Sequence, residues 1–457
     1  MQQLKSAESM PGSYGLPILG ETLEIFRDLE LYIWRRFQQH GSVFKTSVLG
    51  RKRAYLIGPD ANRLVLVEQA ENMSSRMGWY FLEPTFGNNI LLQDGEEHRV
   101  TRRLMYPAFH GKAIATYFDT IQNIVQDFLK DWGEQRTISL NSSFRQLTLM
   151  VATRLFLGSQ NKSEVEQTSQ WFTQLLDSSM AIFKWNVPFT LYGRGQNTRG
   201  KLVAFLRQAM PAAGYAYAQR IEQGNLEESK DVLGLLLAAV DEDGNKLSEA
   251  QVINEALLLL FAGHETTASL LSWVIFELGN HPEWRERLRQ EQLAVVGDNP
   301  LNLSHLKQLP QLTNVLKEAE RLYPPVYAYN RGVIKDIEYA GYCIPAGWFV
   351  TISPMLTHRL PELYTDPARF DPDRFAPPRE EDKKHPLALV GFGHGSHSCL
   401  GMEFAQMEMK IVLSTLLRHY DWTVKPDYSA IAPVRQPSKV KDTLQAYIEP
   451  LNSKLNS

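Results

Sequence analysis

The chain has 457 residues, 44% of them hydrophobic, with a formal net charge of −3 and two cysteines. This charge gives no sign of nucleic-acid binding, and two cysteines exclude a disulfide framework and fit a reducing compartment. The polar start, residues 1–9, does not look like a signal peptide or anchor. The most apolar run, 256–262, is far shorter than the ~20 residues that span a bilayer. We therefore expect a soluble, cytoplasmic protein.

Apolar spacing and turn residues predict the elements in chain order. A loop at 11–21 precedes a helix over 23–40 and two strands, 43–47 and 53–57. Helices follow over 140–157, 164–180, 198–223 and 230–241, and the longest helix runs over 248–280. Strands return at 336–344 and 349–353, a helix covers 402–420, and the tail, 421–450, is irregular with strand-like pieces. We expect a mainly α fold with small β-sheets, and one domain over 1–457 with a flexible start at 1–10, because no linker or repeat divides the chain.

The most informative segment is glycine-rich, runs from Phe392 to Gly401 and contains Cys399. It lies just before the last predicted helix, where the helix macrodipole and free backbone N–H groups favour a thiolate over a thiol. Gly393, Gly395 and Gly401 remove side chains where a flat ligand needs the backbone close. A lone thiolate under a flat surface suits a haem iron whose other axial position is open.

Two other interpretations of Cys399 remain open on these residues alone. His394, His397 and Cys399 are three potential zinc ligands, although no second cluster supplies a fourth. A buried, inert thiol is the usual fate of a free cysteine. The motifs in the rest of the chain favour the haem interpretation over both.

The segment resembles the haem-binding loop of the cytochrome P450 family, whose pattern is Phe-x-x-Gly-x-Arg-x-Cys-x-Gly. Phe392, Gly395, Cys399 and Gly401 match, and His397 stands where the family has an arginine that pairs with a haem propionate. Histidine can replace it as a hydrogen-bond donor, or as a cation if protonated. The resemblance implies the cytochrome P450 fold, haem b (iron-protoporphyrin IX) as cofactor with Cys399 as its axial ligand, and monooxygenase activity.

The long helix contains Ala262-Gly263-His264-Glu265-Thr266-Thr267, which resembles the family's oxygen-activation pattern, Ala-Gly-x-Asp/Glu-Thr-Thr. Ala262 and Thr266 share one helix face, and a hydroxyl and a carboxylate side by side suit proton delivery. The resemblance implies that Thr266 and Glu265 are catalytic and that Ala262 leaves room beside the haem. Taken alone, the same residues fit a buried Thr-Thr face with a solvated glutamate. His264 receives no role.

Two further groups of residues are expected to support the haem. Glu318 and Arg321, one helical turn apart, resemble the family's Glu-x-x-Arg pair, which Arg374 in Pro372–Phe375 would join as a structural staple. A plain surface ion pair is the alternative. By the same resemblance, haem propionates are expected to bind His98, Arg102, Arg331 and His397. The first three could instead be solvated surface groups.

Aromatic and aliphatic side chains in segments that flank the distal face in the family suggest a large apolar substrate, although most aromatics simply pack the core. Residues 15–22, 43–46 and 263–269 resemble the retinoic-acid-hydroxylating branch and its soluble cyanobacterial-type member. The expected substrate is therefore retinoic acid or a related isoprenoid acid. The substrate candidates are Trp79, Phe81, Phe86, Phe183, Trp185, Leu258, Val326, Tyr327 and Tyr329.

The chain carries no Gly-x-Gly-x-x-Gly unit and no cysteines for an iron–sulfur cluster. We therefore expect electrons from a separate ferredoxin or flavodoxin with its reductase. The expected dock includes Arg99, Arg103, Lys112 and Lys410, which are equally compatible with ordinary solvated groups. The alternatives are a peroxide-driven or isomerising haem-thiolate enzyme and a non-enzymatic haem sensor or ligand carrier. The retained Glu265–Thr266 pair argues against both.

Overall fold

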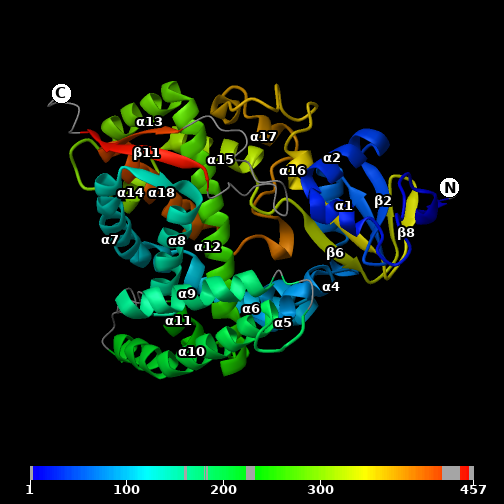
Figure 1. Ribbon diagram of the computed structural model, residues 1–457, viewed down its shortest axis with the longest axis horizontal. Helices are drawn as coiled ribbons and strands as arrows, with labels where there is room; N and C mark the ends of the chain where they lie inside the picture. The colour runs from blue at the N-terminus through cyan, green and yellow to red at the C-terminus, as the bar shows by residue number, and fades with distance from the viewer. Residues whose placement is uncertain are drawn as a thin grey trace.

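Helices dominate the computed structural model, which describes residues 4–451 apart from 159–161, 180, 182–183, 223–231 and 425–442 (Figure 1). The longer helices are α2 (Leu29–His40), α6 (Gly95–Met105), α7 (Lys112–Gln135), α8 (Leu140–Phe156), α9 (Lys162–Ser179), α10 (Leu191–Glu222), α12 (Glu249–Asn280), α13 (Pro282–Val295), α15 (Pro310–Leu322) and α18 (Met402–His419). The shorter ones are α1 (Thr22–Arg27), α3 (Pro59–Arg63), α4 (Ser75–Trp79), α5 (Glu83–Phe86), α11 (Val232–Ala238), α14 (Leu303–Leu306), α16 (Pro354–Thr357) and α17 (Glu381–Lys384).

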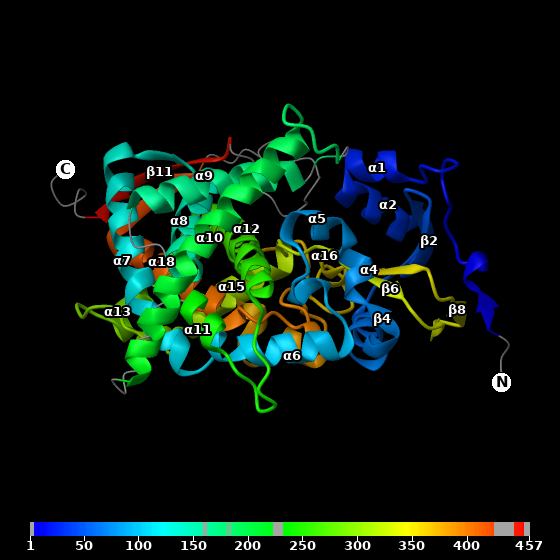
Figure 2. The ribbon, with the colours of Figure 1, turned by 90° about the horizontal axis from the view of Figure 1, so that it is seen from below.

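The strands form three small sheets. The largest has the order β2-β3-β9-β6-β4 and consists of β2 (Val43–Val48), β3 (Arg51–Leu56), β9 (Phe349–Ile352), β6 (Tyr329–Val333) and β4 (Met73–Ser74). A second sheet joins β1 (Lys5–Ser6), β8 (Tyr342–Ile344) and β7 (Ile337–Tyr339), and a third joins β10 (Tyr420–Val424), β11 (Gln445–Pro450) and β5 (Thr137–Ser139). Figures 1 and 2 place this third sheet at the opposite end of the molecule from the N-terminus.

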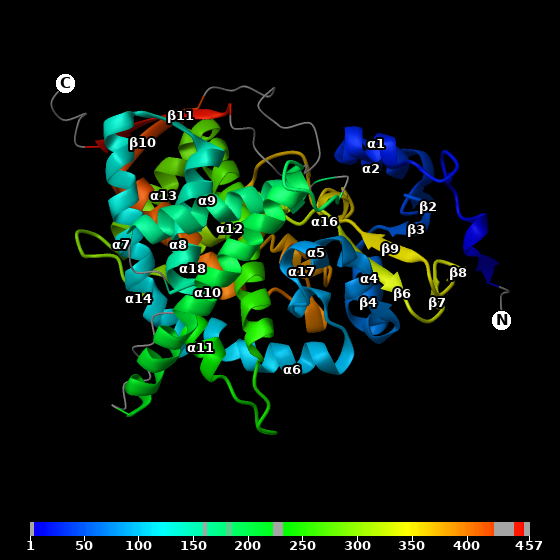
Figure 3. The same ribbon diagram turned by 60° about the horizontal axis from the view of Figure 1, so that its bottom comes forward.

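Helix α12 is the central element of the helical part and stands in the middle of it in Figures 1 and 3. Ser248 caps its N-terminus in a capping box with Gln251, which satisfies backbone N–H groups that a helix start leaves free. Among the described residues, α12 is the one helix long and apolar enough to cross a bilayer, and 72% of its apolar window is buried inside the protein. This burial is what a core helix requires.

The mainly α fold with small sheets is confirmed, and the boundaries differ at several places. The predicted helix over 198–223 begins earlier, at Leu191, and the one over 230–241 is shorter, Val232–Ala238. The predicted helix over 23–40 is two helices, because Asp28 is extended and caps α2 by accepting from the Leu31 N–H, 2.8 Å away. The predicted strand over 336–344 is the hairpin β7–β8, which turns at Ala340 and Gly341, both with positive φ. Strand β6 was not predicted.

The described part of residues 1–10, for which the sequence predicts flexibility, packs against two of the sheets. Lys5 and Ser6 pair with β8 in a parallel register. Ala7 and Met10 are 1% and 2% exposed in a core cluster with strand residues of the large sheet. Backbone pairing and apolar burial together hold this segment against the rest of the chain.

Candidate active site

The glycine-rich segment forms a tight loop ahead of α18. The Cys399 N–H donates to the Phe392 carbonyl, 2.8 Å away. Gly395 has a φ of +68°, and a Cβ there would lie 2.2 Å from the Leu66 carbonyl oxygen, so only glycine fits this position. Helix α18 then begins at Met402, three residues beyond the cysteine. The loop therefore holds the Cys399 backbone rigidly at the start of a helix, as the sequence predicts.

The thiol of Cys399 is accessible although protein surrounds it. Its side chain is exposed, yet burial raises the pKa of the thiol to about 11, while the Gly401 N–H and Arg102 lower it. The side chain is accessible to a water-sized molecule, but protein atoms surround it on most sides. We therefore infer that the sulfur faces space inside the molecule and not bulk water. The helix start does favour the thiolate through the Gly401 N–H, and burial opposes it. A bound metal ion would supply the missing positive charge, since a coordinating thiol is deprotonated.

Helix α12 supplies the opposite wall. Ala262 is exposed although most of α12 is buried, so it also borders internal space. The hydroxyl of Thr266 donates to the Ala262 carbonyl, 2.5 Å away, which is the back-bond expected of a mid-helix threonine. A Cβ on Gly263 would lie 3.1 Å from the Phe156 ring. The small residues thus serve two purposes: Ala262 opens the inner face, and Gly263 allows α8 to pack closely.

The carboxylate of Glu265 is directed toward α8. Its Oε1 lies 2.6 Å from Arg145 Nη2 and 3.3 Å from His264 Nε2. The ring of His264 is 1% exposed, and its Nδ1 lies 3.2 Å from the Thr148 hydroxyl. Sequence reasoning gave His264 no role and missed Arg145 altogether, because their partners lie on another helix and leave no local signal.

Four side chains expected at the haem propionates gather from three segments. The His98 and His397 rings stack with centroids 3.8 Å apart. Burial lowers the pKa of His98 to about 4 and that of His397 to about 2, which favours the neutral imidazole in both. Arg102 donates to the Ser398 carbonyl at 2.8 Å and to its hydroxyl at 3.0 Å.

Arg331 on β6 carries a buried positive charge that one hydrogen bond only partly satisfies. It is 6% exposed, and among the described residues its one hydrogen bond goes to the Asn330 carbonyl, 2.9 Å away. Burial lowers the pKa of this guanidinium to about 10. A buried cation with open donor positions fits a carboxylate. His98, Arg102 and Ser396 also line a recess of about 310 Å³ beside α6. These donors fit the propionates of an iron porphyrin.

The expected staple is fully buried. Glu318, Arg321 and Arg374 are each 0% exposed. Arg321 donates to both Glu318 oxygens, at 2.7 and 2.8 Å, and Arg374 Nε lies 3.0 Å from Glu318 Oε2. Glu381, which the sequence did not indicate, adds a contact at 2.8 Å to Arg374 Nη1. The surface ion pair is therefore excluded, and the cluster joins α15 to the segment that leads into the Cys399 loop.

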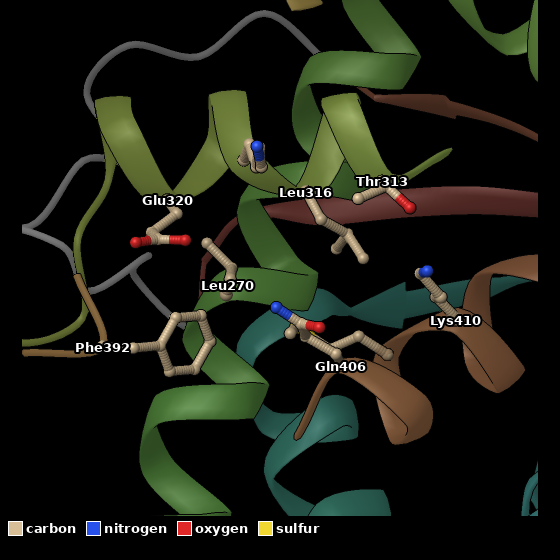
Figure 4. A pocket seen from close by; sticks show the side chains of 9 residues that line it. Leu270, Thr313, Leu316, Glu320, Phe392, Gln406 and Lys410 are labelled. Atoms are coloured by element: carbon tan, nitrogen blue, oxygen red, sulfur yellow. The ribbon is translucent and has the colours of Figure 1, made fainter. Parts of the chain in front are cut away.

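The small cavity in Figure 4 lies between α12, α15, the Cys399 loop and α18. Its volume is about 20 Å³, and Leu270, Leu316, Glu320, Phe392 and Gln406 are among its lining residues. Burial raises the pKa of the Glu320 carboxyl to about 7. The cavity has room for about one water molecule. It is therefore a packing space behind the loop and no substrate site.

The substrate candidates occupy different environments. Trp79 and Phe81 lie together, with ring centroids 5.9 Å apart. Phe86 is fully buried against Phe261, so it packs the core. Trp185 is 66% exposed.

The other candidates lie nearer the core. Tyr329 donates to the Val390 and Gly391 carbonyls, so it supports the Cys399 loop and is not a substrate contact. Leu258 is 5% exposed, Val326 and Tyr327 are half-buried, and Phe183 lies outside the described residues.

The cations expected at the docking site of a redox partner differ in exposure and in their partners. Arg99 is exposed and pairs with Glu96, 2.7 Å away, while Arg103 lies 3.5 Å from Asp243. Lys112 is exposed at the start of α7. Lys410 is half-buried and donates to the Leu306 carbonyl, so the expectation that it offers free surface charge is wrong. The zinc interpretation also fails: in the described part of the chain, no group of three or more histidine, cysteine or acidic residues could hold a metal ion.

Comparisons with known proteins agree with this geometry. The sequence profile of the cytochrome P450 family matches residues 10–448. The chain is 36% identical over 454 residues to the putative cytochrome P450 120 of Synechocystis, covering 98% of both chains. It is 32% identical to the putative cytochrome P450 136 of Mycobacterium tuberculosis, covering 93% of this chain and 88% of that one.

A solved structure described as retinoic acid bound cyanobacterial CYP120A1 superposes with a TM-score of 0.86 and 35% identity. The match covers 98% of this chain and all of that chain. Members of this family use haem b, apolar substrates and, in general, separate redox partners. The chain therefore belongs to the cytochrome P450 family and is a haem-dependent monooxygenase.

Proposed function

We propose that this monooxygenase hydroxylates retinoic acid or a closely related isoprenoid acid. The observation that supports the proposal most is its similarity along almost the whole chain to a structure with bound retinoic acid. The aromatic pair of half-buried Trp79 and exposed Phe81 suits a long polyene. Lys184 donates to the Phe81 carbonyl, 2.6 Å away, and so ties the stretch before α10 to this wall.

Cys399 is the axial ligand in this proposal, and Phe392, Gly393 and Gly401 shape the loop around it. His98, Arg102, Arg331 and His397 hold the propionates. Bound haem supplies the oxygen-activating chemistry, and the sulfur ligand donates electron density that favours O–O cleavage. The protein holds this sulfur in place through the Phe392 carbonyl and through the Glu318–Arg321–Arg374 staple behind the loop.

Helix α12 carries the two residues that would deliver protons in this proposal. Thr266 presents its hydroxyl on the face of Ala262, and Glu265 keeps a carboxylate one residue away. Because Arg145 and His264 hold that carboxylate toward α8, it has to leave them, or act through water, before a proton can reach the Thr266 face.

The proposal includes a single haem domain over 1–457 in a soluble, cytoplasmic protein that receives electrons from a separate ferredoxin or flavodoxin. Arg99, Arg103 and Lys112 remain the candidate dock.

The test is a titration of the purified holoenzyme with retinoic acid, followed by turnover with a surrogate ferredoxin, its reductase and NADPH. A substrate-induced shift of the haem band and a hydroxylated product are expected. No spectral change with any retinoid would refute the substrate, while turnover of another apolar acid would keep the enzyme class.

A further inference from the structure

Four side chains make a continuous path from the protein core to its surface, and the monooxygenase reaction described above uses none of them. Trp273 on α12 is 1% exposed, and its ring lies parallel to Tyr323, with centroids 3.8 Å apart and 1° between the planes. The Tyr323 hydroxyl donates to Glu277 Oε1 in a short hydrogen bond. Glu277 Oε2 lies 3.5 Å from Nε2 of His281, whose side chain is 33% exposed.

The inner end of this path lies close to the Cys399 loop. Leu270 comes one helical turn before Trp273 on α12, so the two lie on the same face. Leu270 lines the small cavity of Figure 4 together with Phe392, the first residue of the loop. Tyr323 follows directly after α15, two residues beyond Arg321 of the staple. The stacked rings therefore begin next to the structure that holds the haem ligand.

We propose that Trp273 and Tyr323 form an oxidation relay, which carries an oxidising equivalent away from the haem when oxygen or peroxide has been activated with no substrate to receive it. One electron passes from Tyr323 through Trp273 to the oxidised haem, which is thereby reduced by one electron. The phenolic O–H bond of Tyr323 breaks, and its proton forms a new O–H bond on Glu277. A thiol or ascorbate then reduces the tyrosyl radical by one electron, and the proton returns from Glu277.

The geometry meets both requirements of such a step. Parallel rings in contact allow electron transfer between their π systems. A tyrosine must lose its proton when it is oxidised, and Glu277 is a base already in hydrogen-bond contact with it. Burial raises the pKa of the Glu277 carboxyl, which makes its carboxylate a better proton acceptor, and burial also raises the pKa of Tyr323, which keeps the resting phenol protonated. Tyr323 is half-buried, so a small reductant can approach it.

Packing alone does not account for this arrangement. A stacked Trp–Tyr pair stabilises a core by about 0.5–1.5 kcal/mol beyond its buried area and needs no acid. Burying a carboxylate is costly unless it is well paired. Glu277 is 7% exposed and meets an imidazole only at 3.5 Å, so its main partner is the Tyr323 hydroxyl. A proton-accepting role explains why an acid lies here.

The test uses substrate-free holoenzyme mixed with hydrogen peroxide or a peracid, frozen within milliseconds to seconds and examined by electron paramagnetic resonance. The wild type is expected to give a tyrosyl radical signal that narrows when ring-deuterated tyrosine is incorporated. Tyr323→Phe keeps the stacked ring and removes the proton, so this signal is expected to disappear and the haem to bleach several-fold faster. Glu277→Gln keeps the size of the side chain and removes the base, so radical formation is expected to slow.

The matched control is Tyr117→Phe. Tyr117 is also fully buried, but its hydroxyl donates to the Ala108 carbonyl, 3.0 Å away, which cannot take a proton. This variant is expected to keep the wild-type signal and bleaching rate. A wild type without a tyrosyl signal, or an unchanged signal in Tyr323→Phe, would overturn the relay. Hydroxylation at saturating substrate should be unaffected in Tyr323→Phe, so a wrong substrate and a wrong relay give different results.

Discussion

The carboxylate of Glu265 reaches across to Arg145 on α8, 2.6 Å away, while the hydroxyl of its neighbour Thr266 donates to the Ala262 carbonyl. The acid and the alcohol of the oxygen-activation motif are thus each held by a different partner. Proton delivery therefore requires a rearrangement or a bridging water. Replacing Thr266 should uncouple electron use from product formation, whereas replacing Glu265 should lower kcat.

Thr266→Ala removes a hydroxyl on the open face of α12. We expect electron use to continue while product falls and hydrogen peroxide rises, because the proton donor next to the reacting oxygen is lost. The coupling efficiency is measured by comparing the NADPH consumed with the product and the peroxide formed. Thr267→Val, at a buried position on the neighbouring face, is the control and should stay coupled. Equal coupling in Thr266→Ala and wild type would contradict the assignment.

Glu265→Gln keeps the shape of the side chain but cannot carry a proton. We expect kcat to fall by ~10²-fold at saturating substrate, with a larger solvent deuterium isotope effect and an unchanged substrate-binding spectrum. Arg145→Lys retains a cation beside the carboxylate and should change kcat much less. An unaltered kcat in Glu265→Gln would show that protons arrive by another route.

Glu318→Gln breaks a carboxylate that serves two fully buried arginines. Leaving these guanidinium groups without their counter-charge should cost about 3–5 kcal/mol of unfolding free energy. Urea unfolding followed by circular dichroism measures the loss, and haem retention on gel filtration should fall with it. Asp127→Asn removes the exposed partner of Lys130 and should leave both properties unchanged. Wild-type stability in Glu318→Gln would mean that the staple is not structural.

His358 predicts an acid-sensitive step in stability. Burial lowers the pKa of this imidazole from 6.5 to about 3, and its Nε2 accepts the Val390 N–H, 3.0 Å away. Between these pH values the unfolded chain binds a proton that the folded protein excludes. Stability should therefore fall by about 1.4 kcal/mol per pH unit as pH drops from 6.5 toward 3, and should level off below that.

The matched variant for this step is His358→Gln, whose amide oxygen can accept the same N–H without titrating. Unfolding curves from pH 7 to pH 4 should show a smaller loss of stability in this variant than in wild type. Parallel pH dependence in the two proteins would rule out His358 as the cause.

Local sequence patterns predicted α12, α18, the Cys399 loop and the mainly helical fold, because each rests on spacing within a single segment. Glu318, Arg321 and Arg374 do come together, but their grouping followed from the family resemblance and not from spacing. The break at Asp28 was missed although the residue type is a good helix cap.

The remaining differences come from tertiary packing. Arg145 meets Glu265 only after α8 and α12 pack together, so its role had no signature in the sequence. Glu381 lies seven residues beyond its partner Arg374, and the stretch between them follows no regular helix or strand pattern.

Burial opposes the thiolate at Cys399 and lowers the pKa of His397. Lys410 and Tyr329 were expected to face ligands or partners, yet backbone carbonyls occupy their polar atoms. Desolvation and backbone hydrogen bonds depend on the whole fold.

The most direct test of the account is the absorption spectrum of the purified protein after reduction with dithionite and addition of carbon monoxide. Cys399 as the iron ligand predicts the strongly red-shifted Soret band of a sulfur-ligated ferrous haem, lost in Cys399→Ala. A band at the position of a histidine-ligated haem, or no band from freshly prepared protein supplied with haem, would contradict it.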